Sequence, residues 1–263
     1  MKDYVDDQSK LLPSSIMDLR PRRSFRVPMG PVLGLGLMQV PICMVFNLVM
    51  AIATDFEATT YSTCHAFNIF PSTSAAAKSQ HKLWAWACWL EFPFLIASAL
   101  LQFRLYRAGL PRPVRSFGCL IAIFLALKGF ILLLWGTFPR ENGDSALHIA
   151  IALSLFVLCA VHIAGSFVCA KYYIHPRNRS LQEELSLRLK SGLLFPYFVS
   201  VVVMWVFYFI HHKWCVSFAY SIFAMSEFIS CECFGLFISL AYLDFYHVYL
   251  CYDQRLGFFL GGI

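Results

Sequence analysis

Titratable side chains lie inside several long apolar runs of this chain, where a charge is costly. They are Glu91, Lys128, Glu227 and Glu232. Such groups in a membrane span usually pair with one another or line a polar cavity, and by default they mark a functional site. Lys128 and Glu227 each lie about 16 Å into their runs, near the middle of a bilayer. We expect Lys128 to pair with Glu227, Glu91 or Glu232, and Glu227 to be the central carboxylate of a polar cavity.

Six apolar runs must position these side chains. The predicted spans are residues 31–53, 83–103, 117–138, 147–170, 193–210 and 216–243. The chain is 59% hydrophobic and only 14% charged, whereas a soluble domain carries about a quarter charged residues. Each run approaches or exceeds the roughly 20 residues that a helix needs to cross the hydrocarbon core. The sequence therefore predicts an all-α polytopic membrane bundle of six transmembrane helices.

The Lys and Arg residues outside these runs are distributed unevenly between the two predicted sides. Sixteen fall in the segments on the side of the termini, and four fall on the other side. The positive-inside rule therefore predicts that both termini are cytosolic. The predicted organisation is a basic cytosolic segment at 1–30, a transmembrane domain at 31–245 and a short cytosolic tail at 246–263. This distribution also accounts for the net charge of +6, so no nucleic-acid partner is expected.

The cytosolic loop before the fifth run contains the stretch SLQEELSLRLK at residues 180–190. Its first four residues form a capping-box pattern, which is typical of a helix start. Leu181, Leu185 and Leu189 recur every four residues and would share one face of that helix. The pattern predicts a short amphipathic helix that lies on the membrane surface.

Two predicted luminal segments, residues 56–78 and the turn around Lys213, carry cysteine and histidine. Cys64 and Cys215 are the two cysteines predicted in luminal loops, where the environment is oxidising. A disulfide between them is one alternative, although a sequence cannot show that their Cα atoms come within bridging distance. A zinc site is the other, and its further ligands would be His65, His211 and His212. Adjacent Cys-His and His-His pairs are not a usual ligand spacing, so we predict no metal and no other cofactor.

Proton transfer is the chemistry that the luminal side could support. The candidate catalytic residues are Glu227, His65 and His148, which we expect to face a lipid-accessible groove open to the lumen. His162, near the middle of the fourth run, is more typical of a hydrogen-bonding residue inside a bundle. The chain contains no G-x-S-x-G elbow, no H-E-x-x-H and no Walker loop. Whether it is an enzyme is therefore left open.

Two stretches resemble the post-GPI-attachment-to-proteins factor 2 family, part of a six-span group that includes the damage-regulated autophagy modulators. The first follows the first run and carries Glu57, Thr59–Thr60, Cys64, Asn68, Pro71–Ser72 and Ser74–Ala75. The second is WCVSFAYSIFAMSEF, which places Cys215, Tyr220, Ile222, Phe223, Ala224 and Glu227 on family positions. Asp244-Phe245 matches the Asp-Phe that closes the family's last span. The resemblance covers residues 30–246.

The chain departs from the family pattern at three places. It is apolar near Ile238, where the family has a histidine, and it has Lys128 near a family carboxylate. The stretch CWLEFPF at residues 88–94 stands where the family has a His-x-x-Pro-Arg-like pattern. The chain thus resembles a divergent paralogue, with altered or lost chemistry if those polar residues carry it in the family.

The resemblance implies fatty-acid remodelling of GPI anchors, in which lyso-GPI-anchored proteins are reacylated with a saturated chain. The implied partners are membrane lipids and GPI-anchored proteins, and the implied location is the Golgi membrane, with the endoplasmic reticulum membrane as an alternative. Glu91, Lys128, Tyr220 and Glu232 would be lipid-binding or intramembrane polar residues. The resemblance leaves open whether such a protein is itself an acyltransferase or assists one.

Two other functions remain as alternatives. A non-enzymatic regulator at the lysosome or plasma membrane would fit the autophagy-modulator branch, and DQSKLL at residues 7–12 fits an acidic-dileucine sorting signal. A transporter or channel rests only on Lys128 and the buried carboxylates, because the sequence shows no inverted repeat and no paired broken helices.

Overall fold

The computed structural model describes residues 25–62, 64–137, 146–174, 179–253 and 257–261. Contacts divide the chain into two units. One is residues 30–246, and the other joins the described residues up to 29 with those from 247 onward.

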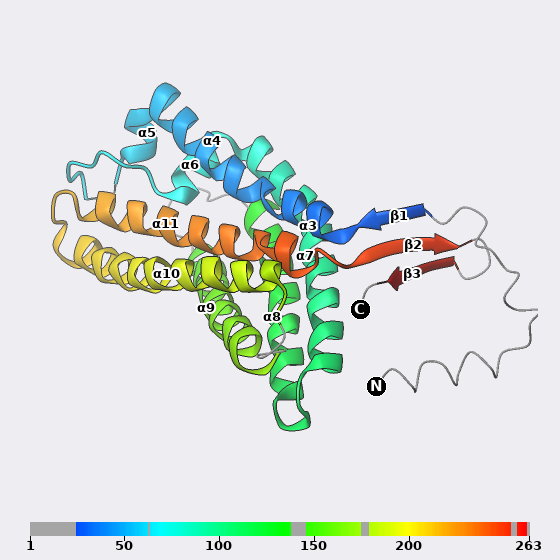
Figure 1. Ribbon diagram of the computed structural model, residues 1–263. Coiled ribbons are helices and arrows are strands. Elements are labelled where there is room, and N and C mark those ends of the chain that lie inside the picture. The colour runs from blue at the N-terminus through cyan, green and yellow to red at the C-terminus, as the bar shows by residue number, and fades with distance from the viewer. Residues whose placement is uncertain (1–24, 63, 138–145, 175–178, 254–256, 262–263) are drawn as a thin grey trace, which may run out of the picture. The chain divides into compact units, whose positions relative to one another are not determined.

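The regular elements of the larger unit are helices (Figure 1). Its elements are α3 (Met29–Leu37), α4 (Gln39–Thr54), α5 (Phe56–Thr60), α6 (Thr73–Ser79), α7 (His81–Gly109), α8 (Arg112–Thr137), α9 (Ala146–Val168), η1 (Cys169–Tyr173), α10 (Leu181–Trp214), α11 (Ala219–Ser239) and α12 (Ala241–Asp244). Among the described residues, six segments are long and apolar enough to cross a membrane, namely Met29–Thr54, His81–Gly109, Arg112–Thr137, Ala146–Tyr173, Leu181–Trp214 and Ala219–Asp244. The predicted six-span helical bundle is confirmed.

Close helix contacts in the bundle depend on small residues. Consecutive spans pack together, α7 on α8, α8 on α9 and α10 on α11, while α4 packs on α7. A Cβ atom added at Gly34 would lie 2.7 Å from Cβ of Tyr242, and one at Gly235 would lie 2.3 Å from Cγ of Pro41. Glycine at these positions lets the first span approach α11 and α12 closely, as is common between membrane helices.

The first span is broken between α3 and α4, a feature that was not expected from the sequence. Pro41 has no backbone N–H, so the carbonyl of Leu37 lacks its usual donor four residues later. At the same place Val40 donates its N–H to the Glu91 carboxylate of α7, at 3.0 Å. A buried side chain thus satisfies a backbone group that the lipid could not.

The fifth predicted span lies within a longer helix. A single helix, α10, runs from Leu181 to Trp214, so residues 180–190 are not a separate helix, and the helix that contains the span begins at 181 rather than at 193. The predicted capping box is confirmed, because Ser180 Oγ accepts from the Glu183 N–H and Glu183 accepts from the Ser180 N–H. At 1.5 Å per residue α10 is about 51 Å long, well beyond a hydrocarbon core of about 30 Å.

The smaller unit contains a three-stranded antiparallel sheet in the order β1 (Phe25–Pro28), β2 (Tyr249–Asp253), β3 (Gly257–Gly261) (Figure 1). Phe25 pairs with Tyr252, and Tyr249 pairs with Gly261. These strands were not predicted. Each is only four or five residues long, which is too short for an alternating pattern to stand out, and β1 pairs with a segment from the other end of the chain.

Candidate functional site

The loop between α4 and α7 is fastened to the α10–α11 turn. Cys64 and Cys215 form a disulfide with a Cα–Cα distance of 5.4 Å. Beside it, the N–H of Phe218 donates to the carbonyl of Phe67 at 3.0 Å. Cys215 ends α10 in the left-handed conformation, with φ of 50°, which turns the chain back into α11. These contacts hold together two segments that lie 151 residues apart in the chain.

Polar side chains of α11 hold the rest of this loop. Ser221 Oγ accepts from the N–H of Ile69 at 2.9 Å, and the Tyr220 hydroxyl donates to Ser72 Oγ at 2.9 Å. Two turns further along, Glu227 Oε2 accepts from the N–H of Thr73 at 2.9 Å. Tyr220 and Glu227 are seven residues apart and so lie on one face of the helix. Part of the Tyr-x-Ile-Phe-Ala-x-x-Glu stretch therefore positions the loop.

A cavity of about 280 Å³ lies between this loop and helices α9, α10 and α11. Lys78, His148, His211, His212, Tyr220 and Glu227 are among its polar lining residues, and Ala152, Phe156, Met204, Trp205 and Phe223 are among its apolar ones. A concave site with an apolar wall and a few convergent polar groups is the usual form of a small-molecule or lipid site. The cavity therefore suits an amphiphile better than a fully polar ligand.

Three of the predicted site residues meet in this cavity, and others do not. Glu227, His148 and Tyr220 all line it. His65 lies on the same loop, but its side chain is exposed and it is not among the lining residues; its ring contacts that of Tyr61 at 5.4 Å between centroids. Glu232 lies five residues beyond Glu227 on α11 and is also not a lining residue.

Of the three partners predicted for Lys128, Glu91 is the one that forms an ion pair with it in the structure. Its Nζ lies 3.4 Å from Glu91 Oε1, and both side chains are buried, Glu91 to 1% exposure. Lys128 Nζ also lies 4.9 Å from the ring centroid of Phe234. The predicted alternatives, Glu227 and Glu232, do not form an ion pair with Lys128 among the described contacts. A cavity of about 50 Å³ adjoins the Lys128–Glu91 pair.

His162 has the hydrogen-bonding environment expected of a histidine inside a bundle. It is buried, and its Nδ1 lies 3.3 Å from the carbonyl oxygen of Ile121 on α8. Its ring also makes edge contacts with Phe234 and Phe237 of α11. It borders a different cavity, at the opposite end of the bundle.

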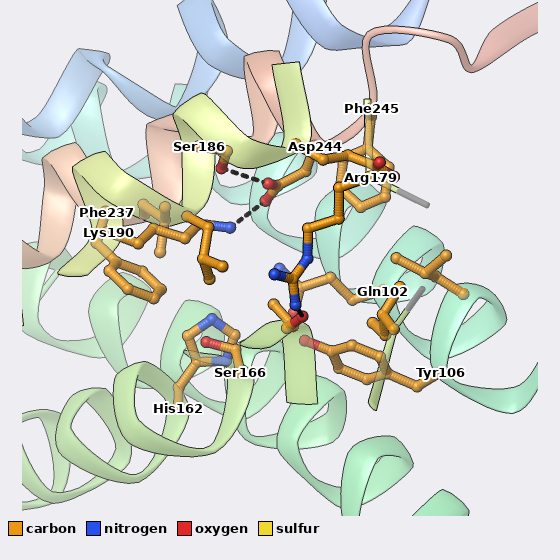
Figure 2. A pocket seen from close by; sticks show the side chains of 16 residues that line it. Gln102, Tyr106, His162, Ser166, Arg179, Ser186, Lys190, Phe237, Asp244 and Phe245 are labelled. Atoms are coloured by element: carbon orange, nitrogen blue, oxygen red, sulfur yellow. Dashed lines mark hydrogen bonds and ion pairs between the residues drawn. The ribbon is translucent and has the colours of Figure 1, made fainter. Parts of the chain in front are cut away.

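The cavity that His162 borders has a volume of about 70 Å³ and is drawn in Figure 2. Lys190 and Ser186 of α10 both contact the Asp244 carboxylate, with Ser186 Oγ at 2.6 Å. Arg179 donates to the carbonyls of Ala170 and Lys171 at the end of the fourth span. The family-like Asp244 thus anchors the start of α10 to α12, and most polar groups here are already bonded within the protein.

Sequence reasoning missed part of both sites. Lys78 was counted only as a topology signal and Trp205 was not singled out, and nothing in their local pattern indicates a cavity. His211 and His212 were considered only as zinc ligands. Ser186 and Lys190 did carry a signal, because their i,i+4 spacing places them on one helix face that lacks the leucines.

Comparisons with known proteins agree with this architecture. A family model described as the Frag1/DRAM/Sfk1/Cwh43P N-terminal domain matches residues 30–248. A Drosophila melanogaster protein named Post-GPI attachment to proteins factor 2 is 28% identical over 250 residues, and a Drosophila pseudoobscura pseudoobscura protein of the same name is 26% identical over 251. Each alignment covers 90% of this chain and 93% of the relative. No solved structure matches the chain.

Proposed function

The chain belongs to the Frag1/DRAM/Sfk1/Cwh43P N-terminal domain family, and from this premise we propose that it acts in the maturation of GPI-anchored proteins. The names of the two relatives support this role. The finer proposal is fatty-acid remodelling of the anchor, with a lyso-GPI lipid as the ligand and the Golgi membrane, or the endoplasmic reticulum membrane, as the location.

The observation that carries the finer proposal is the 280 Å³ cavity. A lyso-GPI lipid has an anionic phosphodiester and a single acyl chain. Lys78 and the imidazoles of His148, His211 and His212, which all line the cavity, are suited to bind a phosphodiester. Ala152, Phe156 and Met204 are suited to the hydrocarbon chain. The cavity therefore matches both halves of this ligand.

Within this proposal, Glu227 and His148 are the candidate groups for proton transfer. Reacylation requires that a hydroxyl of the lyso-lipid lose its proton as its oxygen attacks the carbonyl carbon of an activated acyl ester or thioester, and a carboxylate or imidazole can accept that proton. The bond from this carbon to the donor's leaving group breaks, and the leaving group departs with the proton. The Thr73 N–H fixes the Glu227 carboxylate at the cavity wall. His65 does not line the cavity, so the proposal gives it no step.

Glu227→Gln separates proton transfer from loop positioning, because the glutamine oxygen can still accept from Thr73. General-base catalysis raises the reaction rate by about 10²–10⁴-fold. We therefore expect cells that carry only this variant to accumulate lyso-GPI forms, as cells that lack the gene should do. The measurement is a site-specific lipid profile of GPI anchors, together with surface and secreted amounts of GPI-anchored proteins.

The matched control is Ser221→Ala, which weakens the same loop but removes no titratable group. A normal anchor profile in Glu227→Gln cells would show that Glu227 does not transfer the proton. Unchanged anchors in cells that lack the gene altogether would contradict the proposed function itself. Lysosomal residence that depends on Leu11 and Leu12, which lie outside the described residues, would favour the non-enzymatic regulator instead.

A further inference from the structure

The large cavity and the small cavity beside the Lys128–Glu91 pair share part of their wall. Ala152 and Phe156 of α9 line both of them. Phe156 is 9% exposed, and its backbone carbonyl accepts a hydrogen bond from the Tyr197 hydroxyl at 3.3 Å. Phe156 therefore lies in the wall that the two cavities share.

The two cavities differ in chemistry. The large one has the polar lining residues described above, whereas the small one is lined mainly by apolar side chains, among them Trp84, Leu132, Trp135, Leu155 and Phe234. Its charged groups compensate one another, because Lys128 pairs with Glu91 Oε1 and the N–H of Val40 donates to Oε2. An additional buried polar ligand would have to be desolvated there without a matching charge. The small cavity is suited to hydrocarbon.

We propose that the large cavity holds the single acyl chain of a lysophospholipid, that Phe156 closes the inner end of this channel and so limits the length of chain that fits, and that the small cavity is the space beyond the Phe156 ring. The proposal rests on the function proposed above and adds its chain-length determinant. The phosphodiester lies near Lys78, the chain passes Ala152 and Met204, and its methyl end stops at the Phe156 ring. A chain with further methylenes requires the space beyond that ring.

Two substitutions in the shared wall should act in opposite directions. Phe156→Ala removes the ring and joins the cavities, because a large-to-small change in a packed interior leaves space. Ala152→Leu adds bulk before the ring and shortens the channel. One methylene in an apolar pocket changes selectivity by about 10- to 200-fold, so each variant should shift the yield ratio of long to short chains by at least about tenfold. A general loss of stability would not produce opposite shifts.

The experiment uses the purified full-length protein in lipid nanodiscs. The probes are lysophosphatidylinositols with saturated chains of graded length and a photoactivatable diazirine at the chain end, and mass spectrometry gives the crosslinking yield and the labelled residues. We expect the wild type to be labelled on α9 and α10 with an optimum chain length. Phe156→Ala should move that optimum to longer chains, with label on α7 or α8, which line the small cavity but not the large one, and Ala152→Leu should move it to shorter ones.

Equal labelling by the shortest probe in all three proteins shows that the variants are folded, and Phe156→Met replaces Phe156→Ala if the latter does not fold. Identical chain-length profiles in the wild type and the folded variants would overturn the role of Phe156 while leaving the proposed function intact. Failure of every probe to label the cavity in the wild type would overturn the channel. The proposed function is judged separately, by the anchors of cells that lack the gene.

Discussion

Two buried carboxylates in this protein each bind a backbone N–H of another element, yet their surroundings differ. Glu91 accepts from Val40 at the break in the first span, and Lys128 compensates its charge. Glu227 accepts from Thr73 and lines the large cavity. At the scale of residues, therefore, Glu91 belongs to the framework of the bundle, while Glu227 has both a positioning contact and access to the proposed ligand.

Lys128→Met tests the framework role of the ion pair, because methionine keeps most of the side-chain length and removes the charge. Loss of one partner from a buried pair typically costs about 3–5 kcal/mol, since the remaining charge is uncompensated. We expect a lower free energy of unfolding in thermal or denaturant titrations of the purified protein. The double variant Lys128→Met/Glu91→Gln should recover most of the loss, and an equal loss in both would contradict the pair's role.

The sequence predicted an ion pair for Lys128 but could not choose its partner, although the pair that forms is buried. Predicted depth along a helix says nothing about which helices are neighbours, and Glu227 was predicted at a similar depth. Lys128 belongs to α8, which packs on α7, where Glu91 lies. The tendency of consecutive helices to pack together was the available signal for this choice.

At the scale of elements, α10 shows how a polar stretch can continue a membrane span. The capping box and the leucine repeat predicted a separate surface helix at this place; the cap and the helix are confirmed, but the helix is continuous with the fifth span. In the structure Ser186 and Lys190 both donate hydrogen bonds to the Asp244 carboxylate (Figure 2). Leu181 lies on another face of the helix and is 82% exposed. The contact with Asp244 could not be foreseen, because its two partners lie 58 and 54 residues away in the sequence.

Asp244→Asn tests this anchor between α10 and α12. It removes the anion beside Lys190, and leaving a buried charged donor without its partner costs about 2 kcal/mol, or about 30-fold in local opening. We expect faster hydrogen exchange of the backbone amides at 181–192, measured by mass spectrometry.

The matched control for the Asp244 variant is Arg188→Gln on the same helix. Arg188 pairs with Glu184 on the exposed face, and such a surface i,i+4 pair contributes only about 0.3–0.5 kcal/mol. Exchange at 181–192 should therefore stay close to wild type in this variant. Equally faster exchange in Arg188→Gln and Asp244→Asn would show that the Asp244 contacts stabilise the start of α10 no more than the surface pair does.

At the scale of the whole molecule, apolar run length was enough to predict the six-span bundle, and the family-like motifs identified part of the cavity. The sequence predicted a cavity that includes Glu227 and His148 but did not reveal the rest of its lining, because the wall combines one loop with three helices. Lys78 and Trp205, for example, become neighbours of one space only when that loop folds over α10 and α11. Helical periodicity describes each element by itself and does not describe such a junction.

Orientation is the remaining property on which the proposed function depends. The distribution of Lys and Arg predicts that the cavity end is luminal, and the Cys64–Cys215 disulfide agrees with that prediction, since disulfides persist in oxidising compartments. Asp55→Cys and Gly109→Cys place new thiols at opposite ends of the bundle. Asp55 is exposed, and a Cβ at Gly109 would meet no atom within 4 Å.

In sealed microsomes, a membrane-impermeant maleimide should label the new thiol of Gly109→Cys and should reach that of Asp55→Cys only after detergent is added. Peptide mass mapping distinguishes these thiols from the native cysteines, and the wild-type protein supplies the background. The opposite pattern would place the cavity on the cytosolic side. Because GPI-anchored proteins carry their lipid in the luminal leaflet, that result would remove the ligand from reach of Lys78 and Glu227, and the remodelling proposal would fail.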